Sequence, residues 1–222
     1  NRPNYVNYLT DLKKKIVLYF HNDPTTMLGS SSIADRIKLT KLCSRIIFNS
    51  NWSKKRFLQN MSSYYINSDK LIVINQSAKK ININLKNKER LITFVGKLNK
   101  SKGYDLFGTS IVKILNKYKN WKSIVIGDEP RDQLQFKHKN LKILGFQNHN
   151  KVLSIYKKSS IAVVCSRWDE PFGRTSLEAS SNGCAVIISN RGGLPETITN
   201  GVILKKLDVK NVYNEINKLI IN

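Results

Sequence analysis

Two acidic side chains and the start of a predicted helix lie close together in residues 165–179. Glu170 precedes the helix, and Glu178 lies on it, eight positions further along. The backbone N–H groups at a helix start have no partner inside the helix and attract anions. The residues at this start are Phe172, Gly173, Arg174 and Thr175. Because carboxylates accept hydrogen bonds from hydroxyl groups, the pattern suits a phosphate that carries sugars on both sides.

The same stretch resembles the signature of the retaining nucleotide-sugar glycosyltransferases of the GT-B fold (glycosyltransferase family 4-like, or glycosyl transferases group 1). The family pattern is Glu, seven residues and Glu, with Phe-Gly after the first Glu and Ala after the second, and this chain matches it with Glu170-Pro171-Phe172-Gly173 and Glu178-Ala179. Several residue types match at fixed offsets, which makes the signal specific. The alternative interpretation is a surface helix with two solvated acids.

The resemblance implies a role for each part of this stretch. Glu178 accepts hydrogen bonds from the ribose hydroxyls of the donor. Glu170 is a catalytic residue that holds hydroxyls of the transferred sugar near its anomeric carbon. The N–H groups from Phe172 to Thr175 bind the donor diphosphate and stabilise it most as it leaves and gains charge.

A basic loop follows the predicted strand 91–95. It reads Gly96-Lys97-Leu98-Asn99-Lys100-Ser101-Lys102-Gly103 and resembles the family's Gly-Arg/Lys…Lys-Gly segment, whose two basic residues grip the donor diphosphate. The matching residues are Lys97 and Lys102. Lys97 replaces the Arg that is common there, and an ammonium supplies a point charge without the bidentate fork of Arg. A solvated lysine loop is the alternative.

Two further turns follow predicted strands. Gly127 closes the strand 123–126, and Gly145-Phe146 follows the strand 141–144. The resemblance implies that Gly127 lines the nucleotide pocket. It also implies that Gly145 and Phe146 lie at the base, which family members hold largely through backbone groups. A purely structural turn at Gly127 is the alternative.

Two other segments match the family. Gly192-Gly193-Leu194-Pro195-Glu196 corresponds to a Gly-Gly-x-Pro-Glu segment, and Pro195 suits the first turn of a helix. We interpret this segment as architectural first. His21 closes the strand 16–20, where family members often carry a His that reaches toward the donor sugar. His21 is therefore a candidate catalytic residue, and a structural His is the alternative.

One departure from the family concerns the hinge. The family usually has Pro-Asn-Gly after the strand that enters the linker, whereas this chain has Asn75-Gln76-Ser77-Ala78. The turn must form here without Pro or Gly. Further upstream, Ser53 is predicted to cap a helix that begins at Lys54, because a Ser side chain accepts the first free N–H groups of a helix.

Short apolar segments alternate with helical patterns along the chain. This alternation predicts an α/β fold with a doubly wound, Rossmann-like parallel sheet covered on both faces, and the family resemblance implies that it is of the GT-B type. The predicted strands are 16–20, 45–49, 71–74, 91–95, 123–126, 141–144, 161–165 and 185–189. The predicted helices are 33–43, 53–59, 104–118, 151–157, 174–182 and 209–221.

We predict three parts. Residues 1–78 resemble the end of an acceptor-side N-terminal domain, the polar residues 79–90 form a linker, and residues 91–222 form a donor-binding C-terminal domain. The resemblance therefore covers nearly the whole chain but only about the second half of a complete enzyme.

Composition limits the remaining interpretations. The formal net charge is +23, which fits an anionic substrate, an anionic membrane surface or nucleic acid. The abundance of Lys, Asn and Ile also fits a compositional origin of this charge. Three cysteines without CxxC spacing are predicted to be reduced core residues. With three scattered histidines we expect no metal site, and we expect no cofactor beyond the nucleotide-diphosphate sugar itself.

The resemblance therefore implies a metal-independent, retaining glycosyltransferase that moves a sugar from a nucleotide-diphosphate sugar to a saccharide or lipid-linked acceptor. We expect a cytoplasmic protein with no specific nucleic-acid partner. Peripheral contact with the anionic inner face of the membrane and a fully solvated basic surface are left as alternatives. The alternatives are a nucleotide-sugar-binding fragment without turnover and a basic nucleic-acid-binding protein, which would bind oligonucleotides with a strong salt dependence. A nucleotide-sugar epimerase is a minor alternative.

Overall fold

The computed structural model describes residues 1–66, 68–79, 81–132 and 134–222. Two compact units are present: Asn1–Gln76 with Glu170–Phe172 form the first, and Ser77–Asp169 with Gly173–Asn222 form the second. Lys80, which belongs to the expected linker 79–90, lies outside the described residues. No helix in the described part of the chain is long and apolar enough to cross a membrane.

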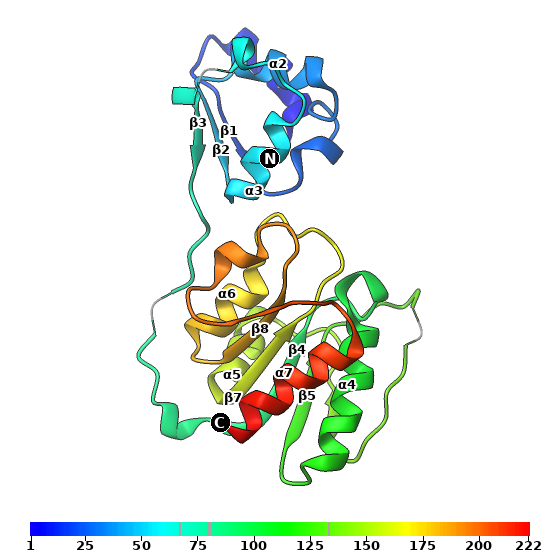
Figure 1. The fold of residues 1–222 in the computed structure, drawn as a ribbon. Helices are drawn as coiled ribbons and strands as arrows, with labels where there is room; N and C mark the ends of the chain where they lie inside the picture. Colours follow the sequence, from blue (N-terminus) through cyan, green and yellow to red (C-terminus); the bar gives the residue numbers. More distant parts are fainter. Residues whose placement is uncertain (67, 80, 133) are drawn as a thin grey trace. The chain divides into compact units, whose positions relative to one another are not determined.

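The second unit is built on a parallel sheet of six strands in the order β6-β5-β4-β7-β8-β9 (Figure 1). The strands are β4 (Glu89–Val95), β5 (Lys122–Ile126), β6 (Leu141–Ile143), β7 (Ser159–Val164), β8 (Ala185–Ser189) and β9 (Val202–Leu204). Most of β4, β7 and β8 is buried. Such continuous apolar strands are typical of a parallel sheet covered on both faces.

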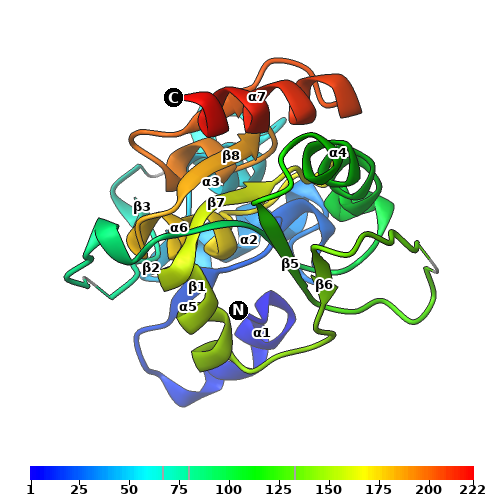
Figure 2. The same ribbon diagram turned by 90° about the horizontal axis from the view of Figure 1, so that it is seen from below.

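Helices cover the two faces of this sheet (Figure 2). Helices α4 (Tyr104–Lys117) and α7 (Val209–Ile221) share one apolar core with Ile92 and Phe94 of β4. Helices α5 (His149–Lys158) and α6 (Arg174–Ser181) share the other core with Leu91. Successive side chains of a strand point to opposite faces, so β4 contributes to both cores. Short 3-10 turns lie at Leu85–Asn87, Lys100–Lys102 and Leu194–Thr197.

The first unit has a parallel sheet in the order β1-β2-β3 (Val17–Phe20, Arg45–Phe48, Leu71–Val73). Its helices are α1 (Val6–Leu9), α2 (Ile33–Leu42) and α3 (Asn51–Leu58), and 3-10 turns lie at Pro3–Tyr5, Thr10–Leu12, Pro24–Thr26, Ser63–Tyr65 and Ser68–Lys70. Three fully buried aromatic rings form the centre of its core. The ring of Phe48 lies 5.6 Å from that of Phe20 and 5.2 Å from that of Phe57.

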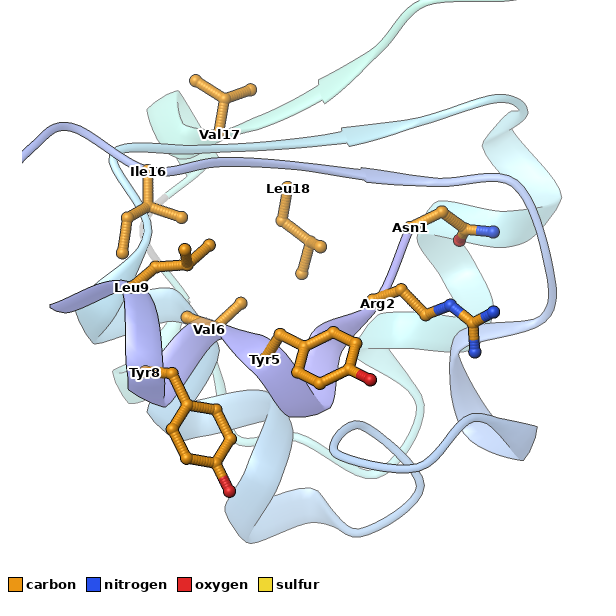
Figure 3. A pocket seen from close by; sticks show the side chains of 9 residues that line it. All are labelled: Asn1, Arg2, Tyr5, Val6, Tyr8, Leu9, Ile16, Val17 and Leu18. Atoms are coloured by element: carbon orange, nitrogen blue, oxygen red, sulfur yellow. The ribbon is translucent and has the colours of Figure 1, made fainter. Parts of the chain in front are cut away.

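An apolar hollow of about 620 Å³ lies between α1 and β1 of the first unit (Figure 3). Tyr5, Tyr8, Leu9 and Val17 line it and are more than two-fifths exposed. β1 is an edge strand in the sheet order. Several exposed apolar side chains are therefore gathered on this face of the unit.

The structure confirms the predicted fold class and corrects some details. The eight predicted strands and six predicted helices are present, with ends shifted by up to two residues. Strand β9 and the helical turns before residue 13 were not predicted, because each is too short to show a periodic pattern. The cap of α3 is also corrected: Ser50, not Ser53, accepts the N–H of Ser53 at 2.9 Å, and the helix begins at Asn51.

The three cysteines are free and buried, as predicted. Cys43 lies in the core of the first unit, and Cys165 and Cys184 lie in the second. Burial raises the pKa of the Cys43 and Cys184 thiols to about 11 and that of Cys165 to about 12. A buried thiolate would lack the hydration that stabilises its charge.

A half-buried lysine, Lys88, joins the chain segment before β4 to two helix ends. The Nζ atom of Lys88 donates to the carbonyl oxygens of Tyr156 (2.9 Å), Ser159 (2.8 Å) and Asn182 (2.6 Å). These carbonyls lie at the C-termini of α5 and α6, where backbone oxygens lack helical partners and the dipole favours a cation. Burial lowers the pKa of Lys88, and the nearby Cys184 opposes this shift.

We expect Lys88→Met to lower the free energy of unfolding by about 3 kcal/mol, because three carbonyls lose a charged donor while a similar apolar stem remains. Urea denaturation monitored by circular dichroism measures this change. Lys86→Met is the matched control, since Lys86 is an exposed neighbour. Equal stabilities of the two variants would contradict the anchoring role.

Candidate functional site

The strand order places a topological switch point between β4 and β7. β4 pairs with β5 on one side and with β7 on the other, so the chain reverses its direction of winding here. Open parallel sheets bind ligands at the carboxyl ends of their strands, at such a switch point. The two loops that leave these ends are residues 96–103 and 165–173. They contain the predicted lysines and the predicted start of the anion-binding helix.

The basic loop after β4 is shaped by Asn99 and Gly103. The Oδ1 atom of Asn99 accepts the N–H of Lys102 at 3.0 Å and the hydroxyl of Ser101 at 2.8 Å, which starts the 3-10 turn. Gly103 ends the turn with a φ of +75°. Lys97 is exposed and Lys102 is half-buried. The turn therefore sets two ammonium groups on a short, ordered segment at the carboxyl edge.

The loops at this edge touch through their backbones. A Cβ atom on Gly103 would lie 1.9 Å from the carbonyl oxygen of Cys165, and one on Gly127 would lie 1.8 Å from that of Gly96. The N–H of Gly127 also donates to the carbonyl of Gly145 at 2.9 Å. Because only glycine allows such approach, these positions bring the ends of β4, β5, β6 and β7 together.

The start of α6 is supported by the Gly-Gly-Leu-Pro-Glu segment. Gly173 precedes the helix with a φ of +112° and supplies no side-chain cap. A Cβ atom on Gly173 would lie 2.4 Å from Cδ2 of Leu194. The hydroxyl oxygens of Ser176 and Thr197 are 2.6 Å apart. Residues 192–196 therefore pack against the helix start.

Glu178 lies in a pocket of about 210 Å³. Its Oε1 atom is 3.1 Å from Nε2 of His149 and 3.0 Å from a guanidinium nitrogen of Arg174. Glu178 is 9% exposed, which is low for a carboxylate. The pocket is lined by Ser77, Ala78, Lys79, Ile81, His149, Leu153, Arg174, Glu178, Ser181 and Asn182. Glu178 is thus a largely buried carboxylate that lines the pocket and is paired with His149 and Arg174.

The structure distributes the predicted residues over both units. His21, Glu170 and Phe172 belong to the first unit, and the others belong to the second. The exposed His21 follows β1, and its Nδ1 lies 3.0 Å from Nε2 of Gln76. Phe146, beyond the end of β6, is 77% exposed.

Sequence reasoning missed two members of the site. His149 was grouped with scattered histidines, but it begins α5 and contacts Glu178. Its position just after Gly145-Phe146 was the available signal. No role is predicted for Arg167, but it binds Asp105 through two hydrogen bonds of 2.6 and 2.8 Å. No sequence spacing connects residues 105 and 167.

The fold and these features define a doubly wound α/β unit with a basic loop and a helix start that follows Gly173 at its switch point. Residues 75–222 match the family described as Glycosyl transferases group 1, and the chain belongs to this family. The uncharacterized glycosyltransferase MJ1607 of Methanocaldococcus jannaschii is 35% identical over 128 residues, which are 54% of this chain and 32% of that protein. The match therefore spans about a third of that relative's length.

Solved structures share the fold. Anabaena Alr3699/HepE in complex with UDP gives a TM-score of 0.77 at 17% identity, covering 98% of this chain and 66% of that one. A glycosyltransferase from Rickettsia africae gives 0.76 at 20% identity, covering 99% of this chain and 64% of that one. The chain thus spans about two-thirds of these GT-B structures, and the likeness confirms the predicted fold.

We expect Gly103→Ala to lower the free energy of unfolding by about 4 kcal/mol, because it combines a left-handed φ with a backbone clash against Cys165. Gly145→Ala is the control: its φ is +66°, but nothing lies within 4 Å of the added Cβ, so only about 1 kcal/mol of backbone strain remains. Urea denaturation compares them. Equal losses would show that the contact at Cys165 is not rigid.

Proposed function

We propose that this chain is the donor-binding part of a glycosyltransferase that transfers a sugar from a nucleotide-diphosphate sugar to a saccharide or lipid-linked glycan. We further propose that the reaction retains the anomeric configuration and needs no metal ion. The proposal rests on three features that the second unit combines. They are the loop with Lys97 and Lys102, the start of α6 without a side-chain cap, and the Glu178 carboxylate.

The diphosphate would lie between the basic loop and the helix start. Lys97 and Lys102 would neutralise it from one side, and the N–H groups of Gly173, Arg174 and Thr175 from the other. Negative charge grows on the diphosphate as the sugar leaves, so fixed donors stabilise the transition state more than the bound substrate. These groups would supply the charge stabilisation that a metal ion gives elsewhere.

The carboxylates would orient the sugars on either side. Glu178 would accept hydrogen bonds from ribose hydroxyls, and His149 and Arg174 hold the carboxylate in place through Oε1. Glu170 would hold hydroxyls of the transferred sugar, with His21 as a second catalytic candidate. The base would lie at the end of β6, near Gly127, Gly145 and Phe146.

The names of similar proteins support parts of this proposal. The Anabaena structure was determined with UDP, which makes UDP a natural first probe. A 28% identical relative from Rhizobium meliloti is a lipopolysaccharide core biosynthesis mannosyltransferase, which favours a glycan acceptor.

A thermal-shift titration with UDP, GDP and ADP, each with and without EDTA, tests the donor site. A ligand that binds only the folded chain stabilises it by about 2.7 kcal/mol at one hundred times its Kd. We expect one diphosphate to raise the melting temperature by roughly 5–10 °C, with no effect of EDTA. No shift with any of the three would contradict the proposal, and a shift abolished by EDTA would contradict metal independence.

We expect Glu178→Gln to weaken binding of the selected diphosphate about tenfold or more, because hydrogen bonds to a charged acceptor contribute about 1.5–3 kcal/mol. Isothermal titration calorimetry measures the affinities. Glu215→Gln is the control, since Glu215 lies on α7 and pairs with Lys218. Unchanged affinity in Glu178→Gln would remove Glu178 from the ribose site.

A further inference from the structure

The loops after β4 and β7 are joined at the carbonyl oxygen of Ser101. This oxygen accepts the backbone N–H groups of Arg167 (2.8 Å) and Trp168 (3.0 Å) and the hydroxyl of Ser166 (3.2 Å). The residues on either side of Ser101 are Lys100 and Lys102 of the basic turn. The segment leading to Glu170 is thus hydrogen-bonded to the middle of the basic turn.

The Arg167 side chain adds a second connection. Its guanidinium donates to the carbonyl of Lys100 (2.6 Å) and to both carboxylate oxygens of Asp105 (2.6 and 2.8 Å). Lys100 begins the 3-10 turn, and Asp105 lies in the first turn of α4. The guanidinium therefore holds both ends of the short segment that contains Lys102.

The electrostatics of this pair fit a fixed contact. Burial alone would raise the pKa of Asp105, but the hydrogen bonds and charge of Arg167 outweigh it and lower that pKa. The bond with Asp105 in turn raises the pKa of Arg167. Both side chains are partly covered: that of Arg167 is 37% exposed and that of Asp105 is 25% exposed. The planar fork of Arg matches a carboxylate in two places, which a Lys would not achieve.

We propose that Arg167 is a positioning residue for the donor diphosphate, which it serves by fixing the Lys102 turn relative to the segment that leads into α6. This inference rests on the proposed function, because a diphosphate held from two loops requires those loops to keep one separation. Binding groups must be held within about 0.5 Å of their productive geometry. The backbone bonds to Ser101 persist without the Arg167 side chain, so its loss loosens the turn without unfolding the unit.

The test compares a nucleoside with its own diphosphate. The probes are uridine and UDP, or the matching pair for whichever base stabilises the chain. We expect Arg167→Met to weaken UDP binding about tenfold and to leave uridine binding unchanged, because uridine has no phosphate. A general structural defect would weaken both ligands alike. An unchanged ratio of the two affinities overturns the proposal.

Four further variants sharpen the test. Asp105→Asn should give a similar loss, and the double variant should be no worse than either single one, because the two side chains act as one pair. Arg167→Lys should recover part of the affinity. Lys218→Met is the control, since Lys218 lies in the last turn of α7, pairs with Glu215 at 2.7 Å and is 63% exposed. Additive losses in the double variant overturn the pairing.

Hydrogen exchange separates this inference from the proposed function. If no diphosphate binds the wild-type chain, the proposed function fails, but the loop connection can still be measured. We expect the amides of Lys102 and Asp105 to exchange roughly tenfold faster in Arg167→Met than in Lys218→Met. Equal exchange overturns the positioning role even where UDP binds.

Discussion

The contact between Gly103 and the carbonyl of Cys165 is the constraint on which the rest of the site depends. The two backbones approach so closely that no side chain fits between them. This spacing brings Ser101 within hydrogen-bonding distance of Arg167 and Trp168. The basic turn and the segment that leads into α6 are therefore fixed by the sheet itself. A site assembled on strand ends in this way needs little adjustment when a ligand binds.

The opposite edge of the sheet is held by a different device. Lys88 binds the C-termini of α5 and α6. His149 and Glu178 connect the same two helices nearer the carboxyl edge of the sheet. The two helices have the same direction, and both N-termini lie at the carboxyl edge of the sheet. They are thus connected at two levels, and the orientation of Glu178 depends on both. The first unit has a comparable cation in Arg36, whose buried guanidinium donates to the carbonyl oxygens of Ser30 (3.2 Å), Ser31 (3.0 Å) and Gln59 (2.8 Å).

The sequence predicted what is encoded locally and missed what depends on tertiary contacts. Apolar strands such as 91–95 and 185–189 show their character in consecutive residues, and the glycines at 96, 103 and 173 mark turns that only they can form. The pairing of Arg167 with Asp105 and the contact of His149 with Glu178 each join residues far apart in the chain. The cap of α3 is predicted at Ser53 but lies at Ser50. Several neighbouring polar residues can start this helix, and tertiary packing selects one of them.

The buried thiols give the chain its own chemical reporters of opening. At neutral pH a thiol with a pKa of about 11 or 12 is almost entirely protonated, and alkylating reagents attack the thiolate. The thiols of the folded chain should therefore react very slowly with such reagents. Cys43 lies in one unit, whereas Cys165 and Cys184 lie in the other. The order in which they are alkylated under mild denaturant reveals which unit opens first, without any engineered label.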